Sequence, residues 1–496
     1  MNSGQLLAAV DLGSNSFRLS VGRVVELSNG LRQIYSIDRL KETVRLAAGL
    51  DSDLILDDTA IWRAESVLKM FGERIKDFPP QNVRAVATNT FRVAKNAHKL
   101  LKVSEAALGF PIEVISGQEE ARLIFSGVAH ELPPSKDNRL VVDIGGGSTE
   151  FIIGSGLEPV IMTSLHMGCV SYTKKFFPNR ELTERAFAQA ELAASKELEV
   201  IRKSYSNIGW KQAFGSSGTA KALVAVLEDT GFSSKGITLD GMAKLKKTMI
   251  KYGQNYSHHV LGLKTDRIEV LPAGLSIMIA IFKTLAIKQM HQGEGALRVG
   301  VLYDMLGRRD ATDKRDETVD LFMQRYHIDK RQAIRVEKLA LDLFDDLNTS
   351  DDESRKYLTW AAKLHEIGLS ISQSSYHKHT AYVLENADLP GFSKDEQKNL
   401  ALISLMHNGS LNKIDLDSLE VNKVRAILCL RLAVLFSRSR QDNGLHEITL
   451  THKKEKSFVI VIPKDWISLH PLTKYSLNLE AEQWLNVGYQ LKIKNS

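Results

Sequence analysis

Two short segments of the sequence combine residue types that bind phosphate. Each begins with an aspartate and continues with glycine and hydroxyl or amide residues, and they run from Asp11 to Ser16 and from Asp143 to Thr149. Glycine lets backbone N–H groups approach an anion closely, and the polar side chains can donate to its oxygens. Tight hairpins also need glycine, but the matched pair predicts that one phosphate is held from two sides. The candidate ligands are Gly13, Ser14, Asn15, Ser16, Gly145, Gly146, Gly147, Ser148 and Thr149.

The aspartate at the head of each segment cannot favour a bare phosphate, because both groups are anions. A divalent cation such as Mg²⁺ would bridge them, directly or through water. Asp143 is the preferred metal ligand and Asp11 the second. The sequence therefore predicts Mg²⁺ as a cofactor.

A third turn of small residues lies between a predicted strand and a helix that begins near Ala220. Unpaired N–H groups and the helix dipole attract anions at such a position. The same residues would also serve simply to turn the chain and cap the helix. Further candidate phosphate ligands are Gly215, Ser216, Ser217, Gly218 and Thr219.

Two adjacent carboxylates, Glu119 and Glu120, fall at a predicted strand-to-helix turn. Helix starts favour glutamate in any case. Transfer of a phosphoryl group to water needs a base that orients and deprotonates that water, and one of these two glutamates could supply it. Their spacing alone does not show whether Glu119 or Glu120 is the base. Arg92, at another such turn, offers a planar fork for phosphate oxygens.

The elements that carry these residues alternate between short β-branched runs and helical patterns. Strands are predicted over 6–12, 83–88, 112–116, 140–144, 150–154 and near 212–216, and helices near 182–204, near 239–252 and after Pro272. Each aspartate-headed segment lies between two strands and is predicted to form the turn of a β-hairpin. The first 310 residues are therefore predicted to form an α/β unit of two similar halves.

Long helical patterns dominate after residue 311, including 331–347 and 357–369. Strands follow over 447–462 around a Lys453-Lys454 turn, then a helix over 472–484 and a strand over 489–493. The predicted domains are two α/β domains over 1–130 and 131–310, an all-α domain over 311–445, and a small C-terminal α/β cap over 446–496.

Composition narrows the classes of protein. The chain has 496 residues, of which 43% are hydrophobic and 25% charged, as in a globular protein with several cores. An apolar run long enough for a bilayer and a basic leader are both missing, which predicts a cytoplasmic protein with no membrane association. Cys169 and Cys429 lack partners at metal-ligand spacing and are expected to be buried.

The net charge of +6 comes from a basic excess before residue 311. Such an excess can attract a polyphosphorylated ligand, a nucleic acid or a membrane. A recognisable nucleic-acid-binding motif is lacking, so we expect no nucleic-acid partner.

Seven motifs occur in order along the chain: Asp11-Leu-Gly-Ser-Asn-Ser-Phe17, Ala87-Thr-Asn-Thr-Phe-Arg92, Ile115-Ser-Gly-Gln-Glu-Glu-Ala-Arg-Leu-Ile124, Val142-Asp-Ile-Gly-Gly-Gly-Ser-Thr-Glu150, Met167-Gly-Cys-Val170, Gly215-Ser-Ser-Gly-Thr219 and Gly295-Ala-Leu-Arg298. They resemble the exopolyphosphatase and guanosine pentaphosphate phosphohydrolase family, within the superfamily of actin, sugar kinases and heat-shock chaperone ATPases. The resemblance implies two actin-like (ribonuclease H-like) domains. It also implies Mg²⁺-dependent release of terminal phosphate from inorganic polyphosphate or from pppGpp, giving ppGpp.

The resemblance also implies roles for particular residues. Glu120 resembles the catalytic base and Asp143 the metal-contacting aspartate, and Glu150, at the end of the same motif, is a further metal candidate. Arg92 and the loops resemble the phosphate binders. Arg267 resembles a basic contact for the guanosine ligand or polyphosphate. Segments 44–49, 430–440 and 466–471 are closer to the guanosine pentaphosphate branch, and a dedicated exopolyphosphatase is the alternative.

Two departures from the family pattern stand out. Val299 replaces the usual glutamate after Arg298, and the helical domain resembles a degenerate HD-type phosphohydrolase domain with Glu366 in place of the metal-binding aspartate. The histidines of this domain are His365, His377, His379 and His407. They are expected to pack or to line a polyanion channel, and a metal site is the alternative. The family resemblance further implies a homodimer formed through this domain.

Two other classes of function share part of the pattern. A sensor would clamp ppGpp or ATP in the cleft without turnover, and a sugar or acetate kinase would transfer phosphate to a carbon substrate. The retained Glu120 and Asp143 argue against the sensor, while the complete Glu-Glu-Ala-Arg stretch and the added helical domain favour hydrolysis over transfer.

Overall fold

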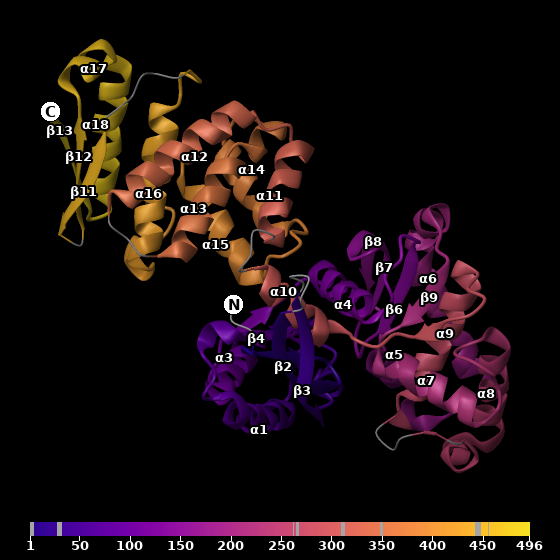
Figure 1. The fold of residues 1–496 in the computed structure, drawn as a ribbon. Coiled ribbons are helices and arrows are strands. Elements are labelled where there is room, and N and C mark those ends of the chain that lie inside the picture. Colours follow the sequence, from indigo (N-terminus) through magenta and orange to yellow (C-terminus); the bar gives the residue numbers. More distant parts are fainter. Residues whose placement is uncertain are drawn as a thin grey trace. The chain divides into compact units, whose positions relative to one another are not determined.

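The structure is a computed structural model that describes residues 4–26, 32–260, 262–263, 267–308, 313–347, 351–441, 448–454 and 456–496. The chain divides into two compact units, Met1–Ala311 (unit 1) and Thr312–Ser496 (unit 2). Figure 1 shows the elements of both. Within the described residues, none of the helices has the length and apolar character needed to span a membrane.

The first half of unit 1 is built on a five-stranded sheet with the strand order β3-β2-β1-β4-β5. Its strands are β1 (Leu6–Leu12), β2 (Ser16–Glu26), β3 (Arg32–Thr43), β4 (Val83–Ala87) and β5 (Ile112–Val114). Its helices are α1 (Asp58–Ile75), α2 (Asn89–Val93), α3 (Ala97–Leu108) and α4 (Gly117–Glu131). β1 pairs with β2 as a hairpin and with β4 in parallel, and its alternating residues belong to two different buried clusters, so the central strand is covered on both faces. That burial explains its nearly continuous apolar sequence, with Leu7 to Val10 fully buried.

The second half repeats this plan in a five-stranded sheet, β10-β9-β6-β7-β8, which matches the first strand for strand when it is read from the other edge. Its strands are β6 (Arg139–Ile144), β7 (Thr149–Ser155), β8 (Glu158–Leu165), β9 (Gln212–Gly215) and β10 (His291–Gln292). Its helices are α5 (Cys169–Phe176), α6 (Glu184–Ile208), α7 (Gly218–Asp229), α8 (Leu239–Tyr252), α9 (Leu271–Leu285) and α10 (Leu297–Gly307). The predictions of two similar α/β halves and of two glycine-turn hairpins are confirmed.

Helices α4 and α10 join the two halves. α10 packs along α4 and against β1, while α4 packs on β7 and β8 of the second sheet. Their backbones meet at two glycines: a Cβ on Gly127 would lie 2.2 Å from the Ala296 carbonyl oxygen, and one on Gly300 would lie 1.8 Å from that of Leu123. One buried cluster consequently contains side chains from both sheets and from both helices.

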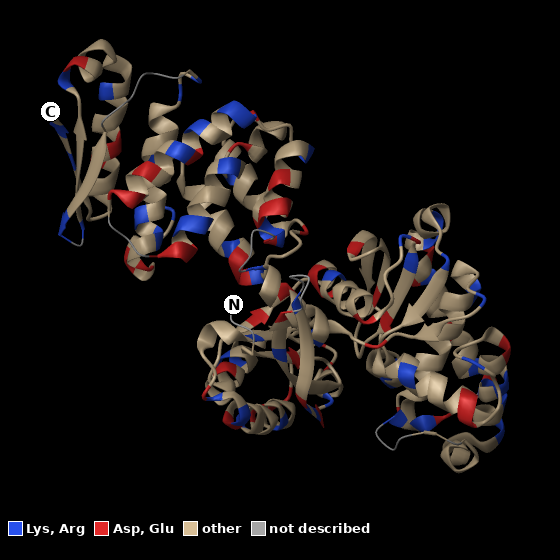
Figure 2. Ribbon diagram, in the orientation of Figure 1, with Lys and Arg blue, Asp and Glu red and all other residues tan. Residues whose placement is uncertain are grey.

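Unit 2 begins with helices and ends with a small sheet. The helices are α11 (Lys314–Arg325), α12 (Lys330–Asp345), α13 (Asp352–Leu364), α14 (Tyr376–Asn386), α15 (Lys394–Met406) and α16 (Val421–Phe436). The C-terminal elements are β11 (Thr449–Lys454), β12 (Ser457–Ile462), α17 (Lys464–Leu469), α18 (Pro471–Asn486) and β13 (Gln490–Asn495). Figure 2 shows Lys and Arg interspersed with Asp and Glu on these helices.

Two predictions about unit 2 are wrong in detail. Lys453 and Lys454 belong to β11 and not to the turn, because Lys454 pairs with Ser457 and the chain reverses between them. The helix predicted over 357–369 ends at Leu364, and a short 3₁₀ helix over Ile367–Ser370 follows. Cys169 and Cys429 are both buried, as expected.

Candidate active site

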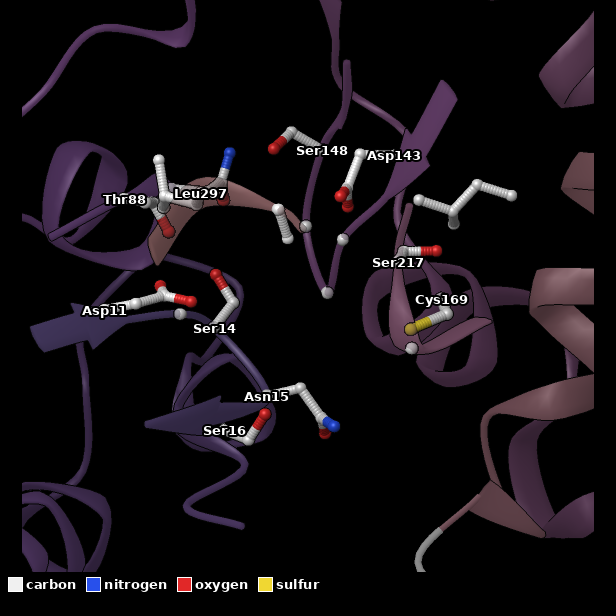
Figure 3. A pocket seen from close by; sticks show the side chains of 18 of the residues that line it. Asp11, Ser14, Asn15, Ser16, Thr88, Asp143, Ser148, Cys169, Ser217 and Leu297 are labelled. Carbon is white, nitrogen blue, oxygen red and sulfur yellow. The ribbon is translucent and has the colours of Figure 1, made fainter. Parts of the chain in front are cut away.

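A small cleft opens where the two hairpin turns of unit 1 face each other. Figure 3 shows Asp11, Ser14, Asn15 and Ser16 on one side and Asp143, Ser148 and Ser217 on the other. The cavity measures about 90 Å³. That is far below the roughly 300–1,000 Å³ of sites that enclose whole ligands. The cleft is therefore sized for one small group, such as a phosphate, and its immediate partners.

The two glycine-rich turns are close-packed against each other. The Thr90 hydroxyl donates to Ser14 Oγ at 2.8 Å within the first half. A Cβ on Gly146 would lie 3.0 Å from Ser14 Cβ, and one on Gly147 would lie 2.4 Å from Asn89 Oδ1. Glycine is thus needed in the second turn because the first half of unit 1 occupies the space of a side chain.

The third turn supports the second hairpin from behind. The Ser216 hydroxyl donates to Asp143 Oδ2 at 2.6 Å, and the Thr219 hydroxyl donates to the Ile144 carbonyl oxygen at 3.2 Å. Ser217 caps α7 by accepting from the Ala220 N–H at 3.1 Å. Only Ser217 and Gly218 of this turn line the cleft. A Cβ on Gly218 would lie 2.2 Å from Nη2 of Arg267, which also lines the cleft.

The two adjacent glutamates at the start of α4 have different surroundings. Ser116 caps this helix by accepting from the Glu119 N–H at 3.1 Å. Glu120 lines the cleft, where Arg92 Nη1 donates to its Oε2 at 2.8 Å. Glu119 is fully buried outside the cleft lining, and Arg122 donates to its two carboxylate oxygens at 2.7 and 2.8 Å. Of the two candidate bases, only Glu120 faces the cleft.

Four carboxylates gather around the cleft, and each has a raised pKa. Burial is the main cause for Asp11, Glu120, Asp143 and Glu150 alike. Arg92 opposes the rise in the pKa of Glu120, and the Ser216 hydroxyl opposes it for Asp143. The pKa of Glu150 lies well above its ordinary value, because the charges of Glu120 and Asp143 add to the effect of burial. This negative cluster is a place where a cation would be stabilised.

Arginines balance part of this negative charge. Arg18 lies opposite Asp11 in the pairing of β1 with β2, and Arg18 and Arg298 both favour the charged form of Asp11. Burial, followed by repulsion from Arg18, lowers the pKa of Arg298 to about 10. Two crowded guanidinium groups beside the cleft favour an anionic ligand.

The structure brings most of the predicted residues to the cleft. Those that line it are Asp11, Gly13, Ser14, Asn15, Ser16, Glu120, Asp143, Gly145, Gly146, Gly147, Ser148, Ser217, Gly218 and Arg267. Those that lie outside the lining are Arg92, Glu119, Thr149, Glu150, Gly215, Ser216 and Thr219. Arg92 holds Glu120, the Thr149 hydroxyl donates to the Met167 carbonyl oxygen at 2.5 Å, and Glu150 accepts from the Ser164 hydroxyl at 2.9 Å.

Some residues of the cleft were not predicted. Arg18, Thr88, Asn89, Cys169 and Leu297 line it as well. Arg18 could have been found from strand alternation, because it lies two residues after Ser16 and so shares its face of β2. Thr88, Asn89, Cys169 and Leu297 all fall inside motifs already recognised, but their own side chains were not singled out.

The histidines of unit 2 are arranged by packing and hydrogen bonding. His365 and His407 are buried, and His407 Nε2 lies 3.0 Å from the Tyr376 hydroxyl. His377 packs edge-on against His407, with ring centroids 6.2 Å apart. Among the residues that the structure describes, no group of three or more His, Cys, Asp or Glu is placed to hold a metal ion.

Paired hairpin turns on two matched sheets, with a carboxylate between them, define a two-domain α/β enzyme that handles a phosphate group. A model of the Ppx/GppA phosphatase family matches residues 23–309, and a model of Ppx/GppA phosphatase domain III matches residues 314–482. The guanosine-5'-triphosphate,3'-diphosphate pyrophosphatase of Pseudoalteromonas translucida is 39% identical over 491 residues, covering 98% of this chain and 97% of the relative. The chain belongs to the Ppx/GppA phosphatase family and is a phosphohydrolase.

Solved structures agree with the fold. An exopolyphosphatase from Cytophaga hutchinsonii matches with a TM-score of 0.54 at 23% identity, over 61% of this chain and 98% of that one. The Aquifex aeolicus PPX-GPPA enzyme matches with a TM-score of 0.50 at 27% identity, over 60% of this chain and 98% of that one.

Replacing Glu150 by glutamine should raise the melting temperature by a few degrees at about pH 8. A raised pKa in the folded protein means that Glu150 stabilises the fold only while protonated, and that this stability is lost as the pH rises through the folded-state pKa. Glutamine removes the charge but still accepts from Ser164. The gain should vanish at about pH 4, where the carboxyl is protonated in both states. Scanning calorimetry without added metal measures this, with Glu158→Gln, an exposed position at the start of β8, as the control. An equal gain at both pH values would contradict the prediction.

The Gly218→Ala variant should raise KM for the phosphorylated substrate roughly tenfold. That is about the effect of losing one hydrogen bond between Arg267 and a substrate phosphate. The new methyl group must displace the Arg267 guanidinium, which is within 2.2 Å of the Cβ position. Arg267→Ala should raise KM by a similar factor. The double variant should have the same KM as either single variant, because both substitutions remove the same contact of Arg267 with the substrate. If steady-state kinetics show that the two increases in KM multiply in the double variant, Gly218 acts independently of Arg267.

Proposed function

We propose that this phosphohydrolase removes the terminal phosphate of pppGpp to give ppGpp, and that it also shortens inorganic polyphosphate from the chain end. The observation that carries the proposal is the position of Glu120, which faces a phosphate-sized cleft between the paired glycine turns. The name of the relative from Pseudoalteromonas translucida, a guanosine-5'-triphosphate,3'-diphosphate pyrophosphatase, supports pppGpp as the preferred substrate.

The cavity size supports action at a chain end. A volume of about 90 Å³ matches one phosphoryl group. The rest of the substrate then lies outside the cleft, which allows a nucleotide and an inorganic chain to use the same site. The Asn15 amide nitrogen supports phosphate as the occupant, because among the described residues this buried donor has no hydrogen-bond partner.

In the proposed reaction, Glu120 deprotonates a water molecule while the water oxygen attacks the terminal phosphorus. The bond between that phosphorus and the bridging oxygen breaks, and the electron pair leaves with the shortened phosphate chain. Arg92 fixes Glu120 through its hydrogen bond of 2.8 Å. Burial raises the pKa of Glu120 toward the working pH, which favours proton acceptance by a general base.

Mg²⁺ fits the carboxylates of the cleft as a proposed cofactor. Mg²⁺ keeps several waters and is commonly held by one or two carboxylates together with substrate phosphates, so a complete protein cage is not required. Asp143 and Asp11 would hold the ion from opposite hairpins, and Glu150 lies opposite Asp143 in the pairing of β6 with β7. When bound, the ion would neutralise phosphate charge.

The finer features implied by the resemblance extend the proposal. We infer that the halves of unit 1 are actin-like, that unit 2 combines a degenerate HD-type helical domain with an α/β cap, and that the protein acts as a cytoplasmic homodimer. The interspersed charges of unit 2 support a solvated surface more than a nucleic-acid-binding stripe.

The Glu120→Gln variant should lose turnover by about 10²- to 10⁴-fold while its KM changes little. Glutamine keeps the size of the side chain and a hydrogen-bond acceptor for Arg92, but it cannot accept the water proton. The matched control is Glu131→Gln, an exposed position at the other end of the same helix. Parental turnover in Glu120→Gln, measured by phosphate release, would exclude Glu120 as the base.

Purified protein should release phosphate faster from pppGpp than from long-chain polyphosphate when both are offered with Mg²⁺ at equal terminal-phosphate concentrations. Chelation with EDTA should abolish release from both, and excess Mg²⁺ should restore it, because the clustered carboxylates repel a bare phosphate chain. Faster polyphosphate cleavage would make the protein a dedicated exopolyphosphatase. Binding without release from either substrate would instead support the sensor.

A further inference from the structure

A charge-balanced cluster of three arginines and three carboxylates lies next to Glu120, the proposed base, because it includes the neighbouring Glu119. Its members are Arg84, Glu113, Glu119, Arg122, Asp304 and Arg308. Asp304 is the shared member: it accepts from Arg84 Nη1 at 2.5 Å, from Arg308 Nε at 2.9 Å and from Arg122. All three arginines favour the ionised form of Asp304 and hold its pKa well below the ordinary value.

The cluster is buried at its centre. The side chains of Glu119, Arg84 and Asp304 are 0%, 4% and 5% exposed. A charge in such a place is tolerated only while its partners surround it in good geometry, and removal of one partner leaves an uncompensated charge. The positions of these side chains are therefore tightly coupled to one another.

The cluster also ties together the elements that build the cleft. Arg84 belongs to β4 in the first sheet, Glu119 and Arg122 to α4, and Asp304 to α10. Helix α4 carries Glu120, and Ala296 and Leu297, at the start of α10, line the cleft. The close approach of α4 and α10 at Gly127 and Gly300 leaves little room for either helix to shift.

We propose that Asp304 is a positioning residue for Glu120, acting through Arg122 and Glu119. This inference rests on the proposed function. Glu119 and Glu120 are neighbours in the first turn of α4, so fixing the Glu119 carboxylate fixes the rotation of that turn about the helix axis. Arg122 grips Glu119 with two hydrogen bonds and contacts Asp304 with the same Nη2 atom that binds Glu119 Oε1. Arg92 holds Glu120 directly, and the Arg122–Asp304 pair holds its neighbour Glu119.

The Asp304→Asn variant should lower kcat by about 10- to 100-fold, the effect expected when a catalytic group is misplaced by about 1 Å. KM should stay close to the parental value, because the phosphate-binding turns are not in the cluster. Arg122→Lys should lower kcat similarly: it keeps the charge but loses the planar fork that reaches Glu119 and Asp304 together. A role that depended only on net charge would leave Arg122→Lys unaffected.

The matched control is Glu191→Gln, which also removes one carboxylate that joins more than one cation. Glu191 accepts from Lys246 and Lys283 at 2.5 and 2.8 Å, is largely buried, and does not line the cleft. It should retain parental kcat. All variants are compared well below their melting temperatures, so that the folded fraction is the same.

Parental kcat in Asp304→Asn would overturn the positioning role. So would a loss that disappears on cooling, because that pattern reports unfolding and not misplacement of the base. Glu120→Gln, assayed in parallel, separates the two hypotheses. If Glu120→Gln is inactive while Asp304→Asn is fully active, only the positioning role of Asp304 is rejected. If Glu120→Gln is active, the assignment of Glu120 as the base is rejected.

Discussion

The close contact between the two glycine-rich turns is the constraint on which the rest of unit 1 depends. Two hairpins from separate sheets can approach this closely only where side chains are absent, as at Gly146, and Gly147 likewise leaves room for Asn89 of α2. Such an approach also requires that the sheets be held at a fixed separation. The paired helices α4 and α10 provide it, since they share one buried cluster with β1 and β6 and their own backbones touch. The packing of α4 and α10 therefore determines the geometry of the cleft.

The same closeness has an electrostatic consequence. Bringing the hairpins together places Asp11, Glu120, Asp143 and Glu150 in one buried region, where each carboxylate is disfavoured in its charged form. The protein offsets this only in part, through Arg92 at Glu120 and Arg18 at Asp11. A site with surplus negative charge and adjacent unpaired donors is poorly stable by itself, and binding of a cation with an anionic phosphate satisfies both sets of groups.

Much of this arrangement followed from the sequence, because the signals are local. Hydrophobic periodicity located the inner strands of unit 1 but not the edge strands β3, β8 and β10. An aspartate before glycine located both hairpin turns, since tight turns depend on neighbouring residues. The matched halves followed from the repeated pattern. What periodicity did not reveal was the partner of each buried charge. Arg122 and Asp304 are 182 positions apart, and no local pattern indicates that α10 returns to pack on α4.

The two adjacent glutamates show why that partner matters. Successive residues on a helix point about 100° apart, so Glu119 and Glu120 had to face different surroundings, but spacing alone did not say which faced the cleft. The structure separates them through their arginines: Arg122 neutralises Glu119 in a buried pair, and Arg92 holds Glu120 at the cleft wall. A carboxylate that is fully paired and shielded from water cannot accept a proton from a bound water molecule. In this fold the arginine partner of each glutamate, more than the identity of the residue, separates the buried, fully paired Glu119 from Glu120, the proposed base.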